Sequence, residues 1–213
     1  MTMQHMNITL DNTGKRYNQE WIFRGVNDEF KSGEHVVLLG ANGSGKSTLL
    51  QTILGSIAPS EGKIIYKHEG KEIELDDVFR YFSFASPYME LPEEFTLTET
   101  LQFHSGFKPF LRNLTASEVL EATGLTKSAN KQIKYFSSGM KQRVKLALCI
   151  FSDTPVALLD EPLSNLDSSG VAWYKNLVTE YSENRLFIVC SNKQADEHFF
   201  CKKELVIEDY KKY

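Results

Sequence analysis

One loop constrains the fold of this chain more than any other feature. Residues 40–48 read GANGSGKST and match the pattern G-x-x-x-x-G-K-[S/T] at every required position. An apolar run at 34–39 precedes the loop and residues 47–54 have helical spacing, so the pattern lies between a predicted strand and a predicted helix. This context argues against a chance match in a loop rich in Gly and Ser. The sequence therefore predicts a phosphate-binding loop.

The chemistry of this loop follows from its residue types. Its glycines let the backbone wrap closely around an anion, while backbone N–H groups and the helix N-terminus point at the phosphates. We expect Lys46 to reach the β- and γ-phosphates and the Ser47 hydroxyl to be a ligand of Mg2+. The predicted nucleotide-binding residues of the loop are Gly40, Ala41, Asn42, Gly43, Ser44, Gly45, Lys46, Ser47 and Thr48.

The composition limits the classes of function that remain. With 213 residues, the chain is long enough for one domain with a buried core, or for one domain that carries a small insertion. Its hydrophobic content of 41% and charged content of 24% are typical of globular proteins. A formal net charge of -4 argues against a surface that coats nucleic acid, so we expect no nucleic-acid partner.

The sequence also bears on the compartment. No apolar run approaches the roughly 20 residues that span a bilayer, and residues 1–9 lack a basic segment followed by an apolar core. We therefore expect a cytoplasmic protein. Cys149, Cys190 and Cys201 have no metal-like spacing, and we interpret them as buried thiols in a reducing compartment rather than as ligands or nucleophiles.

Strands are predicted for most of the chain around the loop. Residues 7–10 alternate like an edge strand, 26–30 form a second short strand, and 63–66 and 72–75 are predicted to form a hairpin. Residues 79–85 are typical of a core strand rich in aromatic side chains. Strands that precede such a loop often pack as an antiparallel edge.

The pattern changes between residues 86 and 135. A helix is predicted near Thr98, and the capping-box signature at 115–118 predicts another. We interpret this segment as a small helical insertion between two strands of the main sheet. His104 has no partner ligands near it in sequence, which favours a surface or core histidine over a metal ligand.

Helices and buried strands alternate in the rest of the chain. Helices are predicted at 137–152 and 168–182, and buried strands at 155–159 and 186–190. This alternation indicates an α/β domain with a mostly parallel sheet, in which the chemistry gathers at the carboxyl ends of the strands.

A carboxylate pair stands at one of those strand ends. Asp160 can hold Mg2+ directly or through water, and Glu161 can orient or deprotonate an attacking water. A surface Asp-Glu pair in a turn is the alternative interpretation. The intact phosphate loop elsewhere in the chain favours the catalytic one.

Further motifs resemble one protein family. Residues 136–143 read FSSGMKQR and match the S-[GS]-G-x-[KR]-Q-R core of the signature motif of ATP-binding-cassette (ABC) ATPases. The stretch at 156–162 resembles the Walker B strand of this family, and 164–167 its D-loop. Residue type alone favours plain strand packing for Tyr17, but this residue falls where the family carries its adenine-stacking aromatic. The resemblance covers essentially the whole chain.

The resemblance implies a fold and a domain organisation. The expected fold class is α/β, a P-loop NTPase core with a mostly parallel sheet, an antiparallel β edge and a small inserted helical subdomain. The whole chain, 1–213, would be a single ABC-type ATPase domain, with the helical subdomain at about 86–135.

The resemblance also implies an enzyme that hydrolyses ATP as a dimer, with ATP and Mg2+ as cofactors. Each ATP would lie between the phosphate loop of one subunit and Ser137 and the Gly139 backbone of the other. ATP would thus close the dimer and hydrolysis would open it. Lys46 and Glu161 are the implied catalytic residues, and Ser47 and Asp160 the implied metal ligands.

Two positions depart from the family pattern. The family usually has a Gln before its helical insertion, where this chain has Ser86 or Pro87. The family also usually has a His after the last core strand, and here that third catalytic position is Asn192. An amide can donate a hydrogen bond to phosphate but carries no positive charge, so we expect hydrolysis that is retained but slow.

The leading interpretation is the ATPase subunit of a membrane transporter, bound peripherally to the cytoplasmic face of the inner or plasma membrane. Its partners would be a separate transmembrane subunit and a second cassette, in a homo- or heterodimer, and the signature and short C-terminus lean toward exporters. The loop at 86–92 and the aromatic side chains of Phe103, Phe107 and Phe110 would offer a groove for a helix of the membrane partner, although for any one of these three residues the core is the favoured place. Alternatives are a soluble ABC-type ATPase acting on DNA or ribosomes, an ordinary P-loop kinase and a weakly active regulatory cassette.

Overall fold

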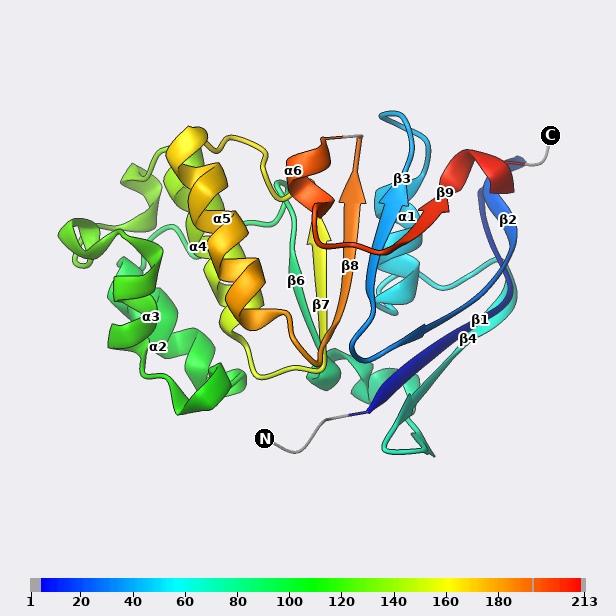
Figure 1. Ribbon diagram of the computed structural model, residues 1–213, viewed down its shortest axis with the longest axis horizontal. Coiled ribbons are helices and arrows are strands. Elements are labelled where there is room, and N and C mark those ends of the chain that lie inside the picture. Colours follow the sequence, from blue (N-terminus) through cyan, green and yellow to red (C-terminus); the bar gives the residue numbers. More distant parts are fainter. Residues whose placement is uncertain (1–4, 193, 212–213) are drawn as a thin grey trace.

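A computed structural model describes residues 5–192 and 194–211 of the chain. Its strands form two sheets. The first has four antiparallel strands in the order β2-β1-β4-β5, and the second has five parallel strands in the order β6-β7-β8-β3-β9. The predicted α/β class, with a parallel sheet and an antiparallel one, is confirmed. In Figure 1 the antiparallel strands lie at the right, the parallel strands in the middle and α2 to α5 at the left.

The elements follow one another along the chain as short units. The strands are β1 (Met6–Tyr17), β2 (Glu20–Lys31), β3 (His35–Leu39), β4 (Glu61–His68), β5 (Lys71–Glu72), β6 (Phe82–Ala85), β7 (Val156–Asp160), β8 (Leu186–Ser191) and β9 (Lys203–Val206). The α-helices are α1 (Lys46–Ile53), α2 (Leu97–Phe107), α3 (Ala116–Thr123), α4 (Ser138–Phe151), α5 (Ser168–Tyr181) and α6 (Ala195–His198). Within the described residues, none of the helices is both long and apolar enough to cross a membrane.

The parallel sheet is buried on both faces, and its alternation divides the core. In β7, Ala157 and Leu159 pack toward the helices α4 and α5, whereas Val156 and Leu158 pack toward α1 and the antiparallel sheet. All five residues of β7 are buried, which explains its continuous apolar sequence. The sheet therefore separates two hydrophobic clusters and holds its own strand ends rigidly.

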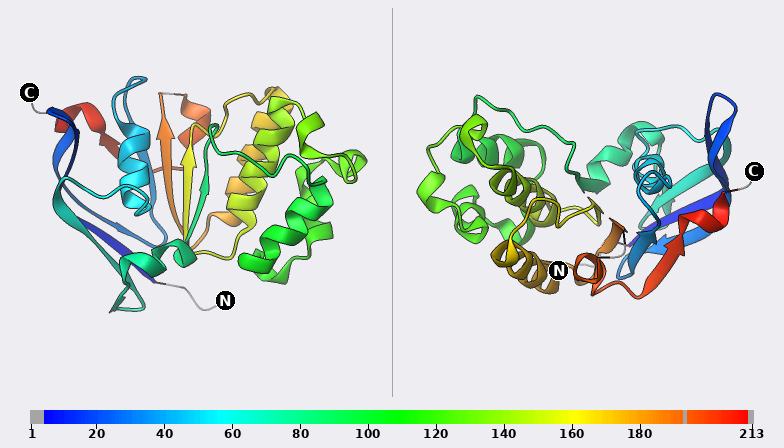
Figure 2. Two further views of the ribbon diagram at one scale, coloured as in Figure 1. Left: turned by 180° about the vertical axis from the view of Figure 1, so that it is seen from behind. Right: turned by 90° about the horizontal axis from the view of Figure 1, so that it is seen from above.

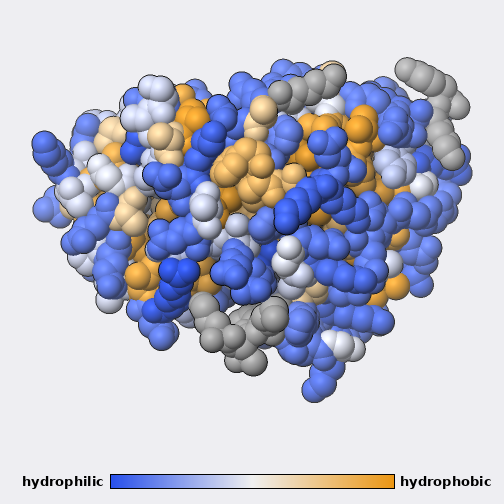
Figure 3. All heavy atoms as spheres, in the orientation of Figure 1, coloured by the Kyte–Doolittle hydropathy of each residue, from blue (hydrophilic) through white to orange (hydrophobic). Residues whose placement is uncertain are grey.

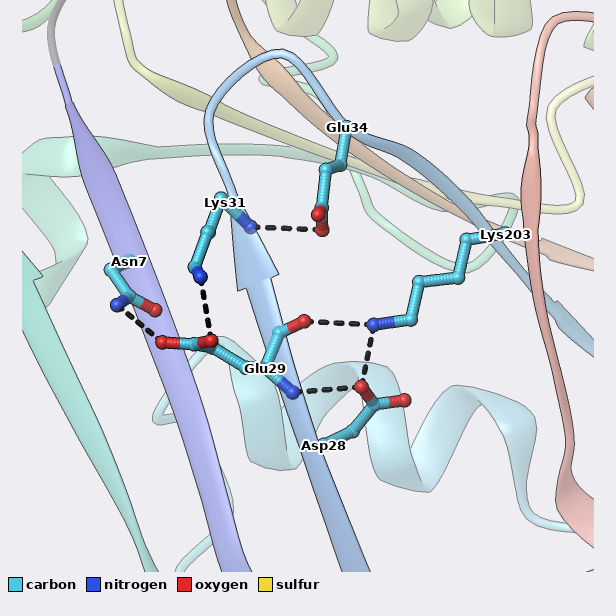
Figure 4. Close-up of polar contacts among 6 residues, drawn as sticks. All are labelled: Asn7, Asp28, Glu29, Lys31, Glu34 and Lys203. Carbon is cyan, nitrogen blue, oxygen red and sulfur yellow. Dashed lines mark hydrogen bonds and ion pairs between the residues drawn. The ribbon is translucent and has the colours of Figure 1, made fainter.

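A polar network joins the two sheets at the surface (Figure 4). The ammonium of Lys203 in β9 bonds the Asp28 carboxylate and the Glu29 carbonyl in β2. Glu29 in turn pairs with Lys31 at 2.7 Å and accepts a hydrogen bond from Asn7 in β1. Such exposed ion pairs add little to stability, so the network mainly fixes how β9 meets β2.

The capping box predicted at 115–118 is present at the start of α3. The Thr115 hydroxyl accepts the backbone N–H of Glu118, whose carboxylate accepts the Thr115 N–H, which is a complete capping box. The same arrangement at Thr96 and Glu99 starts α2. The assignment of 86–135 as a subdomain inserted in a single domain of 1–213 stays a prediction.

The region before β6 departs from the sequence prediction. Residues 75–81 form a 3₁₀ helix, so the expected strand at 79–85 is shortened to Phe82–Ala85, and the expected strand at 72–75 to Lys71–Glu72. Phe79 points out and is 58% exposed. The strand prediction requires its aromatic ring to be buried, and an ion pair between Asp77 and Arg80 supports the helical turn instead.

The predictions for His104 and for the three cysteines can be compared with the structure. His104 is half-buried as expected, with its Nε2 atom 2.8 Å from the Ser152 hydroxyl, and burial lowers its pKa to about 4. The thiols of Cys149 and Cys190 are buried and free, whereas Cys201 is only half-buried. In the part of the chain that the structure describes, no group of three or more His, Cys, Asp or Glu side chains could hold a metal ion.

Figure 3 shows that the face seen in Figure 1 is mostly hydrophilic, with apolar atoms gathered near its middle, over α6.

A buried arginine directly before β8 secures the end of α4. Arg185 donates to the carbonyl oxygens of Thr154 and Ile150, each at 2.7 Å, and to the Thr154 hydroxyl at 3.2 Å. Burial lowers the pKa of this guanidinium to about 10.

We predict that Arg185→Met destabilises the fold by about 3 kcal/mol, because it leaves two buried carbonyl groups and a hydroxyl without their donors. Urea unfolding followed by circular dichroism measures this change. Arg112→Met is the matched control, since Arg112 forms an exposed pair with Glu180 at 3.5 Å and should cost less than about 1 kcal/mol. Equal effects of the two substitutions on the free energy of unfolding would contradict the stabilising role of the buried Arg185 hydrogen bonds.

Candidate functional site

The register of the parallel sheet gathers the candidate site at one edge. Leu39 at the end of β3 pairs with Ser191 at the end of β8, and Asp160 at the end of β7 pairs with Cys190. The phosphate loop, the carboxylate pair and the switch segment, defined here as residues 191–192, therefore lie at the ends of three neighbouring strands. In Figure 1 this edge is at the top of the parallel strands, where the loop after β3 rises and α6 follows β8.

The phosphate loop has the backbone that its glycines predict. Gly45 caps α1 with a φ of 110°, and a Cβ atom there would lie 2.4 Å from the Ile22 side chain. Any other residue would be strained and would also clash. Ser44 has a buried hydroxyl oxygen that finds no hydrogen-bond partner among the described residues. A buried polar atom without a partner in an anion cradle fits a bound phosphate oxygen.

Lys46 and Ser47 take up positions that suit a phosphate chain. The Lys46 ammonium is buried and donates to the carbonyl oxygens of Gly40 at 2.9 Å and Ala41 at 3.0 Å, so it is held over the loop. The Ser47 hydroxyl lies 3.1 Å from the Asp160 carboxylate. Burial raises the pKa of Asp160, and the Ser47 hydrogen bond opposes this shift. A hydroxyl and a carboxylate oxygen are the hard ligands that Mg2+ prefers.

Glu161 follows Asp160 in a strained conformation. Its φ is 43°, in the left-handed region that favours glycine, and its backbone N–H donates to the Cys190 carbonyl at 3.1 Å. A non-glycine residue held in this way costs about 1 kcal/mol or more. The hydrogen bond to β8 holds the turn in this strained conformation. We interpret the strained turn as the feature that directs the Glu161 side chain away from the sheet.

Asn192 contacts the phosphate loop. Its side-chain nitrogen lies 3.4 Å from the amide oxygen of Asn42, and the side chain is exposed. The structure therefore places Asn192, the third predicted catalytic residue, at the side of the loop. At the position where the family usually has a Gln, this chain has Ser86 or Pro87. Ser86 is buried, and the Pro87 carbonyl accepts a hydrogen bond from Lys145 of α4 at 2.6 Å. No glutamine side chain comes from this segment.

The signature residues lie elsewhere. Ser137 caps α4, and its hydroxyl accepts the Met140 N–H at 3.2 Å. A Cβ atom at Gly139 would lie 2.8 Å from the Asn165 carbonyl, so only glycine fits beside the D-loop. In both Figure 1 and Figure 2, α4 lies beyond β6 and β7 from the phosphate loop. The residues predicted to bind the nucleotide therefore lie in two separate groups within one chain.

Tyr17 ends β1 and is 47% exposed. The Lys15 ammonium lies 5.2 Å from its ring centroid, so the ring is not enclosed in a core. This exposure is compatible with the predicted stacking on adenine, which stays a prediction.

The sequence did not point to Glu208. Its carboxylate accepts the backbone N–H of Ala41 at 2.7 Å, across 167 positions of sequence. It lies in the 3₁₀ helix at Ile207–Tyr210 and holds the first turn of the phosphate loop from outside. No local pattern could have revealed this contact, because it depends on β9 pairing beside β3.

Comparison with known proteins agrees with this geometry. The family model described as ABC transporter matches residues 23–164. The cytochrome c biogenesis ATP-binding export protein CcmA of Agrobacterium fabrum is 31% identical over 83% of this chain and 84% of its own length. The lantibiotic transport ATP-binding protein SrtF of Streptococcus pyogenes is 28% identical over 89% of this chain and 81% of its own length.

Solved structures have the same fold. An ATP-binding cassette solved as a dimer in a post-hydrolysis state, bound to ADP and Pi, has a TM-score of 0.80 at 24% identity and covers 94% of each chain. Motif order, fold and sequence similarity agree, and the chain belongs to the ABC transporter family as an ATP-binding subunit whose activity is ATP hydrolysis.

Proposed function

We propose that this chain energises a membrane exporter by closing as a dimer on ATP and opening after hydrolysis. The observation that carries the proposal is the separation of the site into two halves within one chain. The phosphate loop, Asp160 and Asn192 form one half, and Ser137 with Gly139 forms the other, beyond β6 and β7. Two chains arranged head to tail would complete two sites.

The residues of the first half suit phosphoryl transfer to water. Lys46 would neutralise charge on the β- and γ-phosphates, and the Asn192 amide would donate to the γ-phosphate. Glu161 would orient a water molecule and take up its proton as the water oxygen bonds to the γ-phosphorus. The bond from that phosphorus to the bridging oxygen breaks, and ADP leaves with this oxygen.

The metal ligands fit a magnesium nucleotide. Ser47 and Asp160 supply two oxygen atoms, and phosphate oxygens and water would supply the rest, as is usual for Mg2+. When bound, Mg2+ supplies positive charge that neutralises the phosphates. The roles of Tyr17, of the loop residues 40–48 and of Ser137 and Gly139 in holding the nucleotide are part of the proposal.

The proposed membrane partner would dock beside α2. A cavity of about 430 Å³ lies there, lined mainly by apolar side chains, among them Phe79, Phe84, Met89, Phe103 and Phe107. Phe103 and Phe107 are 52% and 74% exposed, which supports a role at a surface. Phe110 is buried at 3% exposure and does not line the cavity, so for this residue the favoured core interpretation holds and the groove interpretation does not. Its ring instead stacks on His104 within the core.

Two features support export over the alternatives. CcmA, to which this chain is similar, is described as an export protein, and SrtF as a transport protein. The chain has no long heptad run of the kind that soluble relatives insert between the motifs. A weakly active regulatory cassette is the second candidate, because Asn192 replaces the usual cationic group.

Purification of the tagged chain from gently solubilised native membranes tests the proposed partner. We expect a multi-span membrane protein in stoichiometric amounts, identified by mass spectrometry. Phe107→Asp should abolish its recovery, because it places a charge in the apolar cavity. Leu75→Asp is the control, since Leu75 is 56% exposed but lies outside the cavity. Recovery from the soluble fraction only, alone or with ribosomal or DNA-repair proteins, would refute the transporter proposal.

We predict that Asn192→His raises the ATP turnover number by about tenfold, because an imidazolium stabilises developing charge on the γ-phosphate better than an amide does. Asn192→Ala should lower the turnover number below that of the parent chain, since it removes the remaining donor. Steady-state phosphate release at saturating ATP measures both. An unchanged or lower rate for Asn192→His would show that the amide is not what limits hydrolysis.

A further inference from the structure

One buried acid joins two segments that the proposed hydrolysis uses. Glu197 lies in α6, just after the switch segment, and is 2% exposed. Its Oε2 atom accepts the Ser191 hydroxyl at 2.5 Å, and its Oε1 atom accepts the Leu163 backbone N–H at 3.4 Å. Its backbone carbonyl accepts the Tyr174 hydroxyl from α5 at 2.8 Å. A residue held at three points is fixed in position.

The two segments held by Glu197 flank the place proposed for the γ-phosphate. Ser191 immediately precedes Asn192, which contacts the phosphate loop. Leu163 lies two residues after Glu161, in the loop that returns from the strained turn. A carboxylate bonded to the Ser191 hydroxyl and to the Leu163 N–H restrains the distance between Glu161, the candidate water-orienting residue, and Asn192, which would donate a hydrogen bond to the γ-phosphate.

Packing alone does not explain why an acidic side chain is buried here. Transfer of a carboxyl group into the interior is unfavourable unless its oxygens are bonded, and both oxygens of Glu197 bond these two segments. The pKa of Glu197 is raised by burial, against the lowering effect of the Ser191 hydrogen bond. An apolar side chain could fill the same space without linking the segments.

We propose that Glu197 is a positioning residue for ATP hydrolysis, which locks the switch segment at 191–192 to the loop at 161–163. This inference rests on the proposed function of the site. Within residues 5–192 and 194–211, the hydrogen bonds of Glu197 do not reach the phosphate loop, so its loss should affect turnover and leave nucleotide binding intact.

Glu197→Ala tests the proposal in ATPase assays on the full chain, with rates expressed per ATP-binding site so that misfolded protein does not count. We expect the turnover number to fall about tenfold or more, while KM for ATP stays within about twofold. Glu197→Gln should restore most of the rate, since an amide oxygen can still accept the Leu163 N–H and the amide group can still bond Ser191.

Two further variants separate positioning from fold stability. Asp196→Ala alters the neighbouring residue of α6, whose carboxylate pairs with Lys175 at 2.8 Å on the surface, and should leave turnover unchanged. Ser191→Ala breaks the same link from its other side and should lower turnover without a further loss in the Ser191→Ala, Glu197→Ala double variant. Loss of activity in Asp196→Ala, a raised KM with unchanged turnover in Glu197→Ala, or additive losses in the double variant would overturn the proposal.

Amide hydrogen exchange tests the link without using activity. Exchange of the Leu163 N–H should be at least about tenfold faster in Glu197→Ala than in the parent, and unchanged in Asp196→Ala. If the parent chain hydrolyses no ATP, the proposed function of the site fails, and unaltered Leu163 exchange in Glu197→Ala would separately refute the link.

Discussion

The site depends on the register of three parallel strands. Because β8 pairs with β3 on one side and β7 on the other, Leu39, Asp160 and Ser191 end at one edge of the sheet. The strands β7 and β8 contribute to hydrophobic clusters on both faces of the sheet, and the middle residues of β3 are buried, so these ends cannot slide relative to one another without exposing apolar surface. Every polar contact proposed for catalysis follows from that fixed edge, since the phosphate loop, the Asp160–Glu161 turn and the switch segment are the connections that leave it.

The same edge supports the proposal that one chain holds only part of a catalytic site. The helix that carries the signature packs against β6 and β7 through apolar residues, and its first turn is held by its own D-loop, where the Asn165 carbonyl fills the space beside Gly139. Gln142 adds a hydrogen bond to the Pro162 carbonyl at 3.0 Å. The signature and the Walker B turn are thus parts of one rigid unit. In the proposed cycle, a change at the γ-phosphate would reach the opposite half of the site through this unit, by way of Glu197 and Leu163.

Local patterns allowed much of this arrangement to be predicted. The phosphate loop, the capping box at Thr115 and the buried strand before Asp160 each have a mechanism that acts within about ten residues, and the sequence therefore revealed them. The contacts of Glu197 with Ser191 and Leu163, and of Glu208 with Ala41, join segments that only the folded sheet brings together. The 3₁₀ helix at 75–81 was missed because aromatic residues favour strands unless, like Phe79, they remain exposed.

The central claim is that hydrolysis requires two chains, and the dependence of ATP turnover on protein concentration tests it most directly. The purified chain should show a turnover number per subunit that rises with protein concentration. Mixing it with an inactive Ser137 variant should change the rate in proportion to the fractions of parent, mixed and variant dimers. A turnover number per subunit that is constant from nanomolar to micromolar concentrations, with ATP-bound protein remaining monomeric in light scattering, would contradict the account.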